Sequence, residues 1–152
     1  MENIICPMAN RSFRKLSISD LQLVLQMEKD FRSEFVCLEN ARLFLSNPAN
    51  LIFACIENNR IIGFAYGYEL NRLNNTGNML YIHEVGVLPE YHRQGIGKQL
   101  LSGIKSLCKL SGICRFFLFT EKSNIAACAL YESAGGEPAH NDDVTYFFSN
   151  FD

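Results

Sequence analysis

The stretch HEVGVLPEYHRQGIGKQLL, residues 83–101, determines how this sequence is interpreted. It begins with strand-forming residues, is interrupted by Pro89, and continues through Gly95 and Gly97 into leucines at helical spacing. The pattern predicts a strand, a turn, and a helix that extends from Gly95 to Leu110. A glycine-flanked junction of this kind leaves backbone N–H groups unpaired, and the helix dipole adds partial positive charge. The stretch therefore predicts an anion-binding turn of the type that holds phosphate.

The side chains around this turn exclude two common nucleotide motifs. Arg93 and Lys98 add positive charge to the turn. A dinucleotide-binding fingerprint would need a third glycine where Leu100 stands, and a P-loop would need Ser or Thr where Gln99 follows the lysine. On this motif alone, a glycine-rich helix start without any ligand is as good an interpretation as an anion site.

Length and composition define the class of protein. The chain has 152 residues, 48% of them hydrophobic, and a net charge of −2. This length predicts one domain over residues 1–152. Nucleic-acid surfaces carry an excess of Lys and Arg, so the acidic balance argues against a nucleic-acid partner and suits a small cationic one. No stretch approaches the roughly 18 consecutive apolar residues of a membrane span, so we expect no membrane partner.

The six cysteines, at positions 6, 37, 55, 108, 114 and 128, show no pairing pattern. They form no C-x-x-C pair and have no histidine at zinc-site spacing, so we expect no metal site. The N-terminal sequence MENIICPMANRSF has no apolar run of signal-peptide length. Reduced thiols and no secretion signal are the expectation for a cytoplasmic protein.

Hydrophobic periodicity predicts strands and helices on both sides of the 83–101 stretch. Strands are expected at 13–17, 51–57, 60–70, 79–88, 112–120 and 143–151, and helices at 21–35, 38–45, 95–110 and 124–134. This order predicts an α/β (α+β) fold with a mixed, mostly antiparallel central sheet and about four helices on its faces.

Two motifs resemble the GNAT acetyltransferase family. VLPEYHRQGIGKQLL, residues 87–101, resembles the family's Q/R-x-x-G-x-G/A turn, which holds the pyrophosphate of acetyl-CoA. SNIAACALYESAGG, residues 123–136, resembles its N-x-x-A-x-x-L-Y-x-x-x-G helix, which holds the pantetheine arm. Two positions depart from the pattern, with His92 in place of Gln or Arg and Gly136 in place of an aromatic residue. The resemblance implies a GNAT-like domain, acetyl-CoA as cofactor, and cofactor contacts from Val85, Gly86, Val87, His92, Arg93, Gln94, Gly95, Ile96, Gly97, Lys98, Asn124, Ala127 and Tyr131.

Three shorter stretches look most like the aminoglycoside 3-N-acetyltransferases within that family. They are FRSEF at 31–35, YIHEVGV at 81–87 and DDVTYFFSNF at 142–151. This finer resemblance implies that the acceptor is a primary amine of a small cationic molecule, an aminoglycoside, and that the enzyme confers antibiotic resistance. It also implies a homodimer.

The chemistry of acetyl transfer to an amine assigns candidate roles. The amine must lose a proton, the oxyanion needs hydrogen-bond donors, and the departing thiolate needs a proton. Glu84, on the strand before the turn, is the candidate base, and the Tyr131 phenol is the candidate acid. A backbone N–H between Val85 and Val87 is the candidate oxyanion donor, helped by Gly86 if the strand bulges there. Without the resemblance, a solvated carboxylate and a core tyrosine would explain Glu84 and Tyr131.

Acceptor contacts are expected from four residues, His83, Glu34, Asp142 and Asp143. In a regular strand His83 and Glu84 leave opposite faces, so both can line one pocket only if the strand bulges. Acidic residues in loops are usually solvated, which is the competing explanation for Asp142 and Asp143.

Two other functions remain open from the sequence. A protein or peptide N-acetyltransferase would need a groove between the first helices and the loop at 71–78. A non-catalytic CoA-binding sensor would bind the cofactor without turnover, and the presence of both Glu84 and Tyr131 argues against it. Because acceptor loops vary between proteins that share a cofactor motif, the sequence does not name the acceptor.

Overall fold

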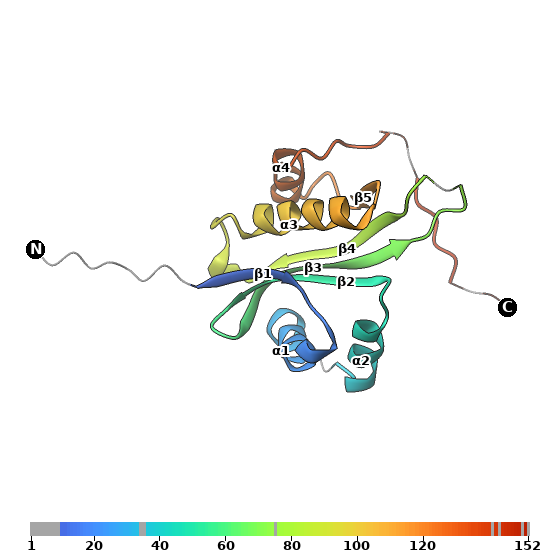
Figure 1. The fold of residues 1–152 in the computed structure, drawn as a ribbon. Helices are drawn as coiled ribbons and strands as arrows, with labels where there is room; N and C mark the ends of the chain where they lie inside the picture. The colour runs from blue at the N-terminus through green and yellow to red at the C-terminus, as the bar shows by residue number, and fades with distance from the viewer. Residues whose placement is uncertain are drawn as a thin grey trace, which may run out of the picture.

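A computed structural model describes residues 10–33, 36–74, 76–140, 142, 144–149 and 151. These residues form a five-stranded sheet in the order β1-β2-β3-β4-β5 (Figure 1). The strands are β1 (Arg11–Lys15), β2 (Asn50–Glu57), β3 (Arg60–Leu70), β4 (Met79–Val87) and β5 (Arg115–Leu118). Strands β1 to β4 pair antiparallel, and β5 pairs parallel to β4. The predicted mixed, mostly antiparallel sheet is confirmed.

Four helices cover the two faces of this sheet, two on each (Figure 1). They are α1 (Leu21–Arg32) and α2 (Leu38–Ser46) on one face, and α3 (Ile96–Ser111) and α4 (Ile125–Ser133) on the other. Two short 3-10 turns, η1 (Ile18–Asp20) and η2 (Pro89–Tyr91), precede α1 and α3. Within the described residues, no helix has the length and apolar character needed to cross a membrane.

The core is divided by the sheet into two apolar clusters. The cluster on the α3 face includes Leu80, Ile82, Ile96, Leu100 and Ile104. The cluster on the α1 face includes Val24, Met27, Ala41, Ile52 and Phe64. Because helices pack on both faces, β2 is buried along nearly its whole length and shows no apolar–polar alternation. Strand β4 is therefore held between two packed layers, with its C-terminal end leading into α3.

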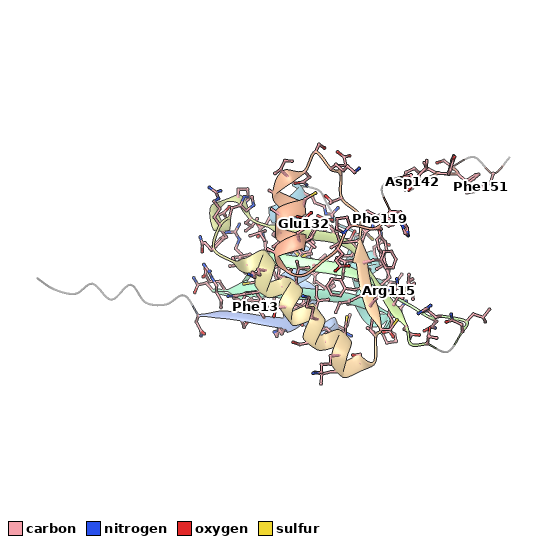
Figure 2. All side chains as sticks on the ribbon, turned by 90° about the horizontal axis from the view of Figure 1, so that it is seen from above. Phe13, Arg115, Phe119, Glu132, Asp142 and Phe151 are labelled. Atoms are coloured by element: carbon pink, nitrogen blue, oxygen red, sulfur yellow. The ribbon has the colours of Figure 1, made fainter. Side chains whose placement is uncertain are left out.

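The prediction of a last strand at 143–151 is wrong for the residues that the structure describes, 144–149 and 151. Exposed fractions run from 70% for Val144 to 89% for Phe147, and Phe151 is also largely exposed. Figure 2 shows Asp142 and Phe151 on a segment that lies apart from the sheet. Aromatic and β-branched residues favour strands in general, but a strand needs a partner and a packed face. The described residues of this segment have neither.

Candidate active site

The pairing of β4 with β5 ends halfway along β4. The parallel ladder joins Met79–Ile82 to Arg115–Leu118 and goes no further. Beyond that point β4 continues to Val87, paired with β3 alone. The residues from His83 to Val87 therefore lie at an opening in the sheet, immediately before the turn that leads into α3.

A β-bulge lies at the start of this opening. Tyr66 of β3 pairs with Glu84, while the next residue, Gly67, pairs with Ile82, so His83 is an extra residue on β4. Gly67 is required here because a Cβ on it would lie 1.9 Å from the carbonyl oxygen of a β4 residue. The bulge lies at His83 and not at Gly86, the other position where the sequence left a bulge open.

The bulge turns His83 and Glu84 to the same face of the sheet. The His83 ring lies 5.2 Å from the Tyr66 ring, centroid to centroid, and Glu84 forms an ion pair with Arg32 of α1. Both contacts are on the face that carries α1 and α2. In a regular strand these two side chains would leave opposite faces, and the bulge supplies the condition under which both can line one pocket.

Arg32 holds the Glu84 carboxylate. Its Nη2 donates to Oε2 of Glu84, and its Nε lies 3.0 Å from a carboxylate oxygen of Glu28. Burial acts to lower the pKa of Arg32, but the charges of Glu84 and Glu28 outweigh it and raise that pKa. Burial also raises the pKa of Tyr66, the ring beside this group. The result is a cation placed against the carboxylate that faces the opening.

The turn after β4 has the geometry of an anion site. Arg93 and Gly95 have positive φ angles of 61° and 77°, and a Cβ on Gly95 would meet no atom within 4 Å. The first helical hydrogen bond of α3 runs from the Gln99 N–H to the Gly95 carbonyl at 3.0 Å. The backbone N–H groups before Gln99 therefore lie ahead of the helix's own hydrogen-bond ladder. His92 Nε2 lies 2.8 Å from the Val87 carbonyl oxygen and ties the turn to the strand.

Gly97 lies against a neighbouring helix, whereas Gly95 borders open space. A Cβ on Gly97 would lie 2.9 Å from Cδ2 of Leu130, so its absence lets α4 lie close to α3. At Gly95 the missing Cβ leaves open space beside the turn, whereas at Gly97 it permits the close packing of α4. Asn124 caps α4, because its side chain accepts a hydrogen bond from the Ala127 N–H at 3.1 Å.

Tyr131 lies on α4, on the opposite side of the sheet from the Glu84 carboxylate. Burial raises the pKa of its phenol, so Tyr131 keeps its proton at neutral pH. The two candidate catalytic residues thus come from different layers, and the opening between β4 and β5 lies between those layers.

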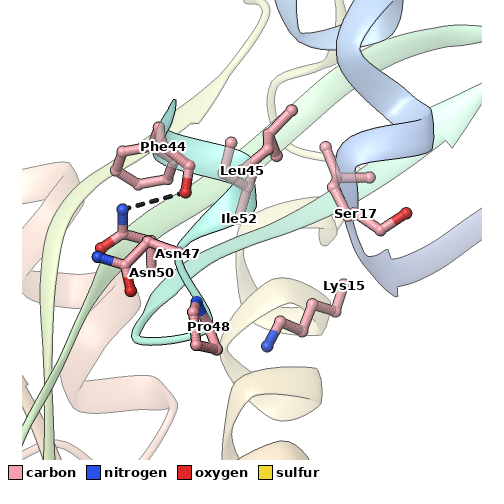
Figure 3. Close-up of a pocket in the computed structure, with 9 residues that line it drawn as sticks. Lys15, Ser17, Phe44, Leu45, Asn47, Pro48, Asn50 and Ile52 are labelled. Carbon is pink, nitrogen blue, oxygen red and sulfur yellow. Dashed lines mark hydrogen bonds between the residues drawn. The ribbon is translucent and has the colours of Figure 1, made fainter. Parts of the chain in front are cut away.

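Two hollows lie on the α1 and α2 side. One, of about 150 Å³, lies between the end of β1 and the connection from α2 to β2 (Figure 3). It receives no residue from β4 or from the turn at 92–98. The other, of about 250 Å³, is lined by Val24, Met27, Glu28, Arg32, Val36, Asn40, Ala41, Phe44, Ile52, Tyr66 and Tyr68. Because Arg32 and Tyr66 line it, this second hollow adjoins the Glu84 ion pair.

Residues 16–136 match the model of the Acetyltransferase (GNAT) family. The chain belongs to the GNAT family. The matched region contains the bulge, the turn and all of α4, so the GNAT assignment covers the whole of this site. The predicted family and fold class are confirmed.

Curated GNAT relatives differ in the substrates they are named for. The chain is 32% identical over 99 residues to the mycothiol acetyltransferase of Kocuria rhizophila, which is 63% of this chain and 32% of that protein. It is 39% identical over 54 residues, 36% of each chain, to the ribosomal protein bS18-alanine N-acetyltransferase of Escherichia coli strain K12. The match spans about a third of the length of these relatives.

Solved GNAT structures superpose over nearly the whole chain. An aminoglycoside acetyltransferase from an uncultured soil metagenomic sample, in complex with trehalose, has a TM-score of 0.81 at 21% identity, covering 93% of this chain and 97% of its own. Aminoglycoside N-acetyltransferase AAC(6')-Iy in complex with CoA has a TM-score of 0.78 at 16% identity, covering 97% and 99%. At these identities the likeness establishes the shared fold.

The GNAT site contains some of the predicted acceptor residues and lacks others. His83 and Glu84 lie together, whereas Asp142 is exposed on the C-terminal segment apart from the sheet (Figure 2). Glu34 and Asp143 lie outside the described residues. Arg32 was not predicted as a site residue, although it stands within the FRSEF stretch. The ring pairs at alternate positions of β3, β4 and β5 were not predicted either.

Proposed function

We propose that the protein transfers the acetyl group of acetyl-CoA to a primary amine of a small cationic acceptor, with aminoglycosides as the candidate class. The observation that carries the proposal is that one continuous segment, residues 83–97, supplies a carboxylate at the opening of the sheet and an open anion turn just beyond it. A base and a phosphate site on one rigid segment are what this transfer needs.

The chain's residues fit acetyl-CoA. The turn at 92–98 combines unpaired N–H groups at a helix start, the open space at Gly95, and the charges of Arg93 and Lys98, which suits a diphosphate. Asn124, Ala127 and Tyr131 of α4, with the backbone of Val85 to Val87, would hold the remainder of the molecule. When bound, acetyl-CoA supplies an activated thioester. Residues 1–152 would then form one such domain, and the cytoplasmic homodimer stays a prediction of the sequence.

The proposed roles follow from position and protonation. Glu84 takes the proton of the acceptor amine, directly or through water, and Tyr131 donates a proton to the leaving sulfur. Its raised pKa keeps Tyr131 in the acid form that this role needs. The Arg32 guanidinium now occupies Oε2 of Glu84, so a cationic amine entering the site competes with Arg32 for the same carboxylate.

The acceptor class is supported by the solved structures with this fold. Three of these proteins are aminoglycoside acetyltransferases, and one of the three is also described in complex with sisomicin. The 3-N position, which the sequence resemblance implies, stays a prediction, since one neighbour is named for the 6' position. Acetylation of a peptide N-terminus is the second candidate, favoured by the relative that acts on ribosomal protein bS18.

A release assay for free CoA tests the proposal. Purified protein is mixed with acetyl-CoA and, in turn, with aminoglycosides, peptides and polyamines. We expect turnover with the aminoglycosides. Glu84→Gln should lower kcat by about 100-fold, and loss of the carboxylate that pairs with the acceptor's ammonium should also raise KM. Glu90→Gln is the matched control, because Glu90 is an exposed carboxylate of η2 paired with Arg60. Full activity of Glu84→Gln would remove its role as base, and turnover with peptides alone would remove the aminoglycoside class.

A further inference from the structure

A continuous row of rings crosses β3, β4 and β5 on the face that carries α1 and α2. This aromatic band consists of Tyr66, Tyr68, Tyr81, His83, Phe117 and Phe119. Each ring has a neighbour in the band with centroids between 5.2 and 6.3 Å apart. The parallel register places Phe117 directly beside Tyr81, so the row continues across the last strand pair.

The aromatic band is not part of the closed core. Tyr66, Tyr68, Tyr81 and Phe117 are half-buried, and His83 and Phe119 are exposed, Phe119 by 72%. By contrast, the neighbouring strand residues on the α3 face, Leu80 and Ile82, are each 1% exposed. Stacked rings that stay open on one side form a surface on which another flat or apolar group can lie.

The band connects the two features that the reaction needs. At one end Tyr66 and Tyr68 line the 250 Å³ hollow, where Phe44 of α2 closes over them with ring centroids 5.7 Å away. At the other end His83 and Phe119 lie where the pairing of β4 and β5 stops. Tyr66 is also the register partner of Glu84, so the candidate base is adjacent to the band.

The charged groups beside the band are few. The Arg32 guanidinium contacts two carboxylates, Glu28 and Glu84. The predicted acidic surround at Asp142 is not part of this group. A polycationic chain would find little else to pair with among these residues, whereas rings attract a cation and pack against a ring.

We propose that the aromatic band is the acceptor-binding surface, and that the acceptor carries its reacting amine on a ring that lies against Tyr66, Tyr81 and Phe117. This inference rests on the proposed N-acetyltransferase function and narrows its substrate class to ring-bearing amines, including amino sugars. The ring packs on the band while its ammonium replaces Arg32 at Glu84. A linear polyamine forms the charge contact and loses the stacking contact.

Kinetics with matched acceptors test the inference. Tyramine and glucosamine, each with one amine on a ring-bearing molecule, are compared with agmatine and spermidine. The ring-bearing pair should give the higher kcat/KM, by about tenfold or more. The double variant Phe117→Leu/Phe119→Leu should raise KM for the ring amines about tenfold and leave the linear amines unchanged. Phe147→Leu, an exposed phenylalanine of the C-terminal segment, is the control and should change neither.

A binding measurement separates this inference from the proposed function. The chain has no tryptophan and six tyrosines, of which Tyr66, Tyr68 and Tyr81 belong to the band. A change in tyrosine emission that is lost when Tyr66 and Tyr68 are replaced therefore reports on the band. Titration with tyramine is unsuitable because tyramine itself emits, so glucosamine and spermidine are the probes. If glucosamine changes the emission of the wild-type protein and not of Tyr66→Leu/Tyr68→Leu, the band binds ring amines even when no turnover is seen. Preference for spermidine, or a KM unaffected by Phe117→Leu/Phe119→Leu in folded protein, overturns the inference.

Discussion

Substitution of Gly95 by Asp or by Asn separates charge from shape at the anion turn. Gly95 has φ 77° and ψ 8°, a left-handed conformation that Asn and Asp tolerate better than other side chains. A Cβ there meets nothing within 4 Å, so both variants should fold with a cost of about 1 kcal/mol. The two side chains have nearly the same size and differ by one negative charge. The pair therefore isolates the electrostatic contribution of the turn to ligand binding.

The expected magnitude can be estimated from linkage and Coulomb's law. Acetyl-CoA at 100 times its Kd should stabilise the wild type by about 2.7 kcal/mol, which raises Tm by roughly 5–10 °C for a chain of this size. A carboxylate about 4 Å from a phosphate charge costs about 1 kcal/mol in water and about 4 kcal/mol at an effective dielectric constant of 20. An intermediate cost of about 2.7 kcal/mol weakens binding roughly 100-fold. The stabilisation of Gly95→Asp then falls to about 0.4 kcal/mol, or roughly 1 °C.

Differential scanning fluorimetry with and without acetyl-CoA measures these shifts directly. Gly95→Asn should keep a shift of several degrees, and Gly95→Asp should lose nearly all of it. Raising the salt concentration should restore part of the Gly95→Asp shift, because the repulsion is screened. Equal shifts for the two variants would refute the placement of a diphosphate at this turn. Loss of the shift in both would show that the open space at Gly95, and not its charge environment, matters.

Three further predictions concern stability and reactivity. Gly67→Ala should cost about 3 kcal/mol or more in urea unfolding, because its Cβ would lie 1.9 Å from a backbone oxygen; a cost below 1 kcal/mol would contradict the bulge. The Arg14 guanidinium holds the pKa of Asp20 below its usual range, so Asp20→Asn should lose about 1–2 kcal/mol at pH 7. That difference should narrow as pH falls below about 4, because Asp20 of the unfolded chain then takes up a proton, and it should continue to narrow until folded Asp20 is protonated at its lower pKa; a constant difference would argue against the pair. Burial raises the pKa of Cys55 to about 11, so iodoacetamide at pH 8 should label exposed Cys37 and spare Cys55.

The order of elements could be predicted because it depends on local pattern. Alternation and apolar runs identified the hairpin of β2 and β3, and leucine spacing identified α3. The tail at 144–149 has the same kind of composition and yet forms no strand in the structure. Strand propensity is a property of residues, whereas a strand also needs an edge to pair with and a face to cover. A single sequence carries the first kind of information and not the second.

The turn before α3 could be predicted for a related reason, and the surroundings of Glu84 could not. The turn depends on contiguous residues, of which Arg93 and Gly95 have left-handed backbone conformations. The surroundings of Glu84 are assembled from α1, α2, β3, β4 and β5, so their members are dispersed through the sequence. Arg32 reaches Glu84 across 52 positions, a pairing that no local motif records. From charge alone, the acidic residues near the C-terminus were plausible acceptor contacts. Only the fold shows that Asp142 lies apart from Glu84 and the sheet.

The one-residue bulge at His83 explains why the side chains of β4 face other directions than in a regular strand. If side chains alternated without interruption from Ile82, Glu84 would face α3 with the apolar cluster, where an unpaired carboxylate is costly to bury, and Val85 and Val87 would face α1. With the bulge, Glu84 faces α1 and meets Arg32, and Val85 and Val87 pack against the α3 side. The bulge therefore reverses the side-chain directions from Glu84 to Val87, which places the carboxylate beside a cation and the valines in the apolar cluster. Gly67, which permits the close approach of β3 to β4 at this point, is as necessary to the site as the carboxylate that it positions.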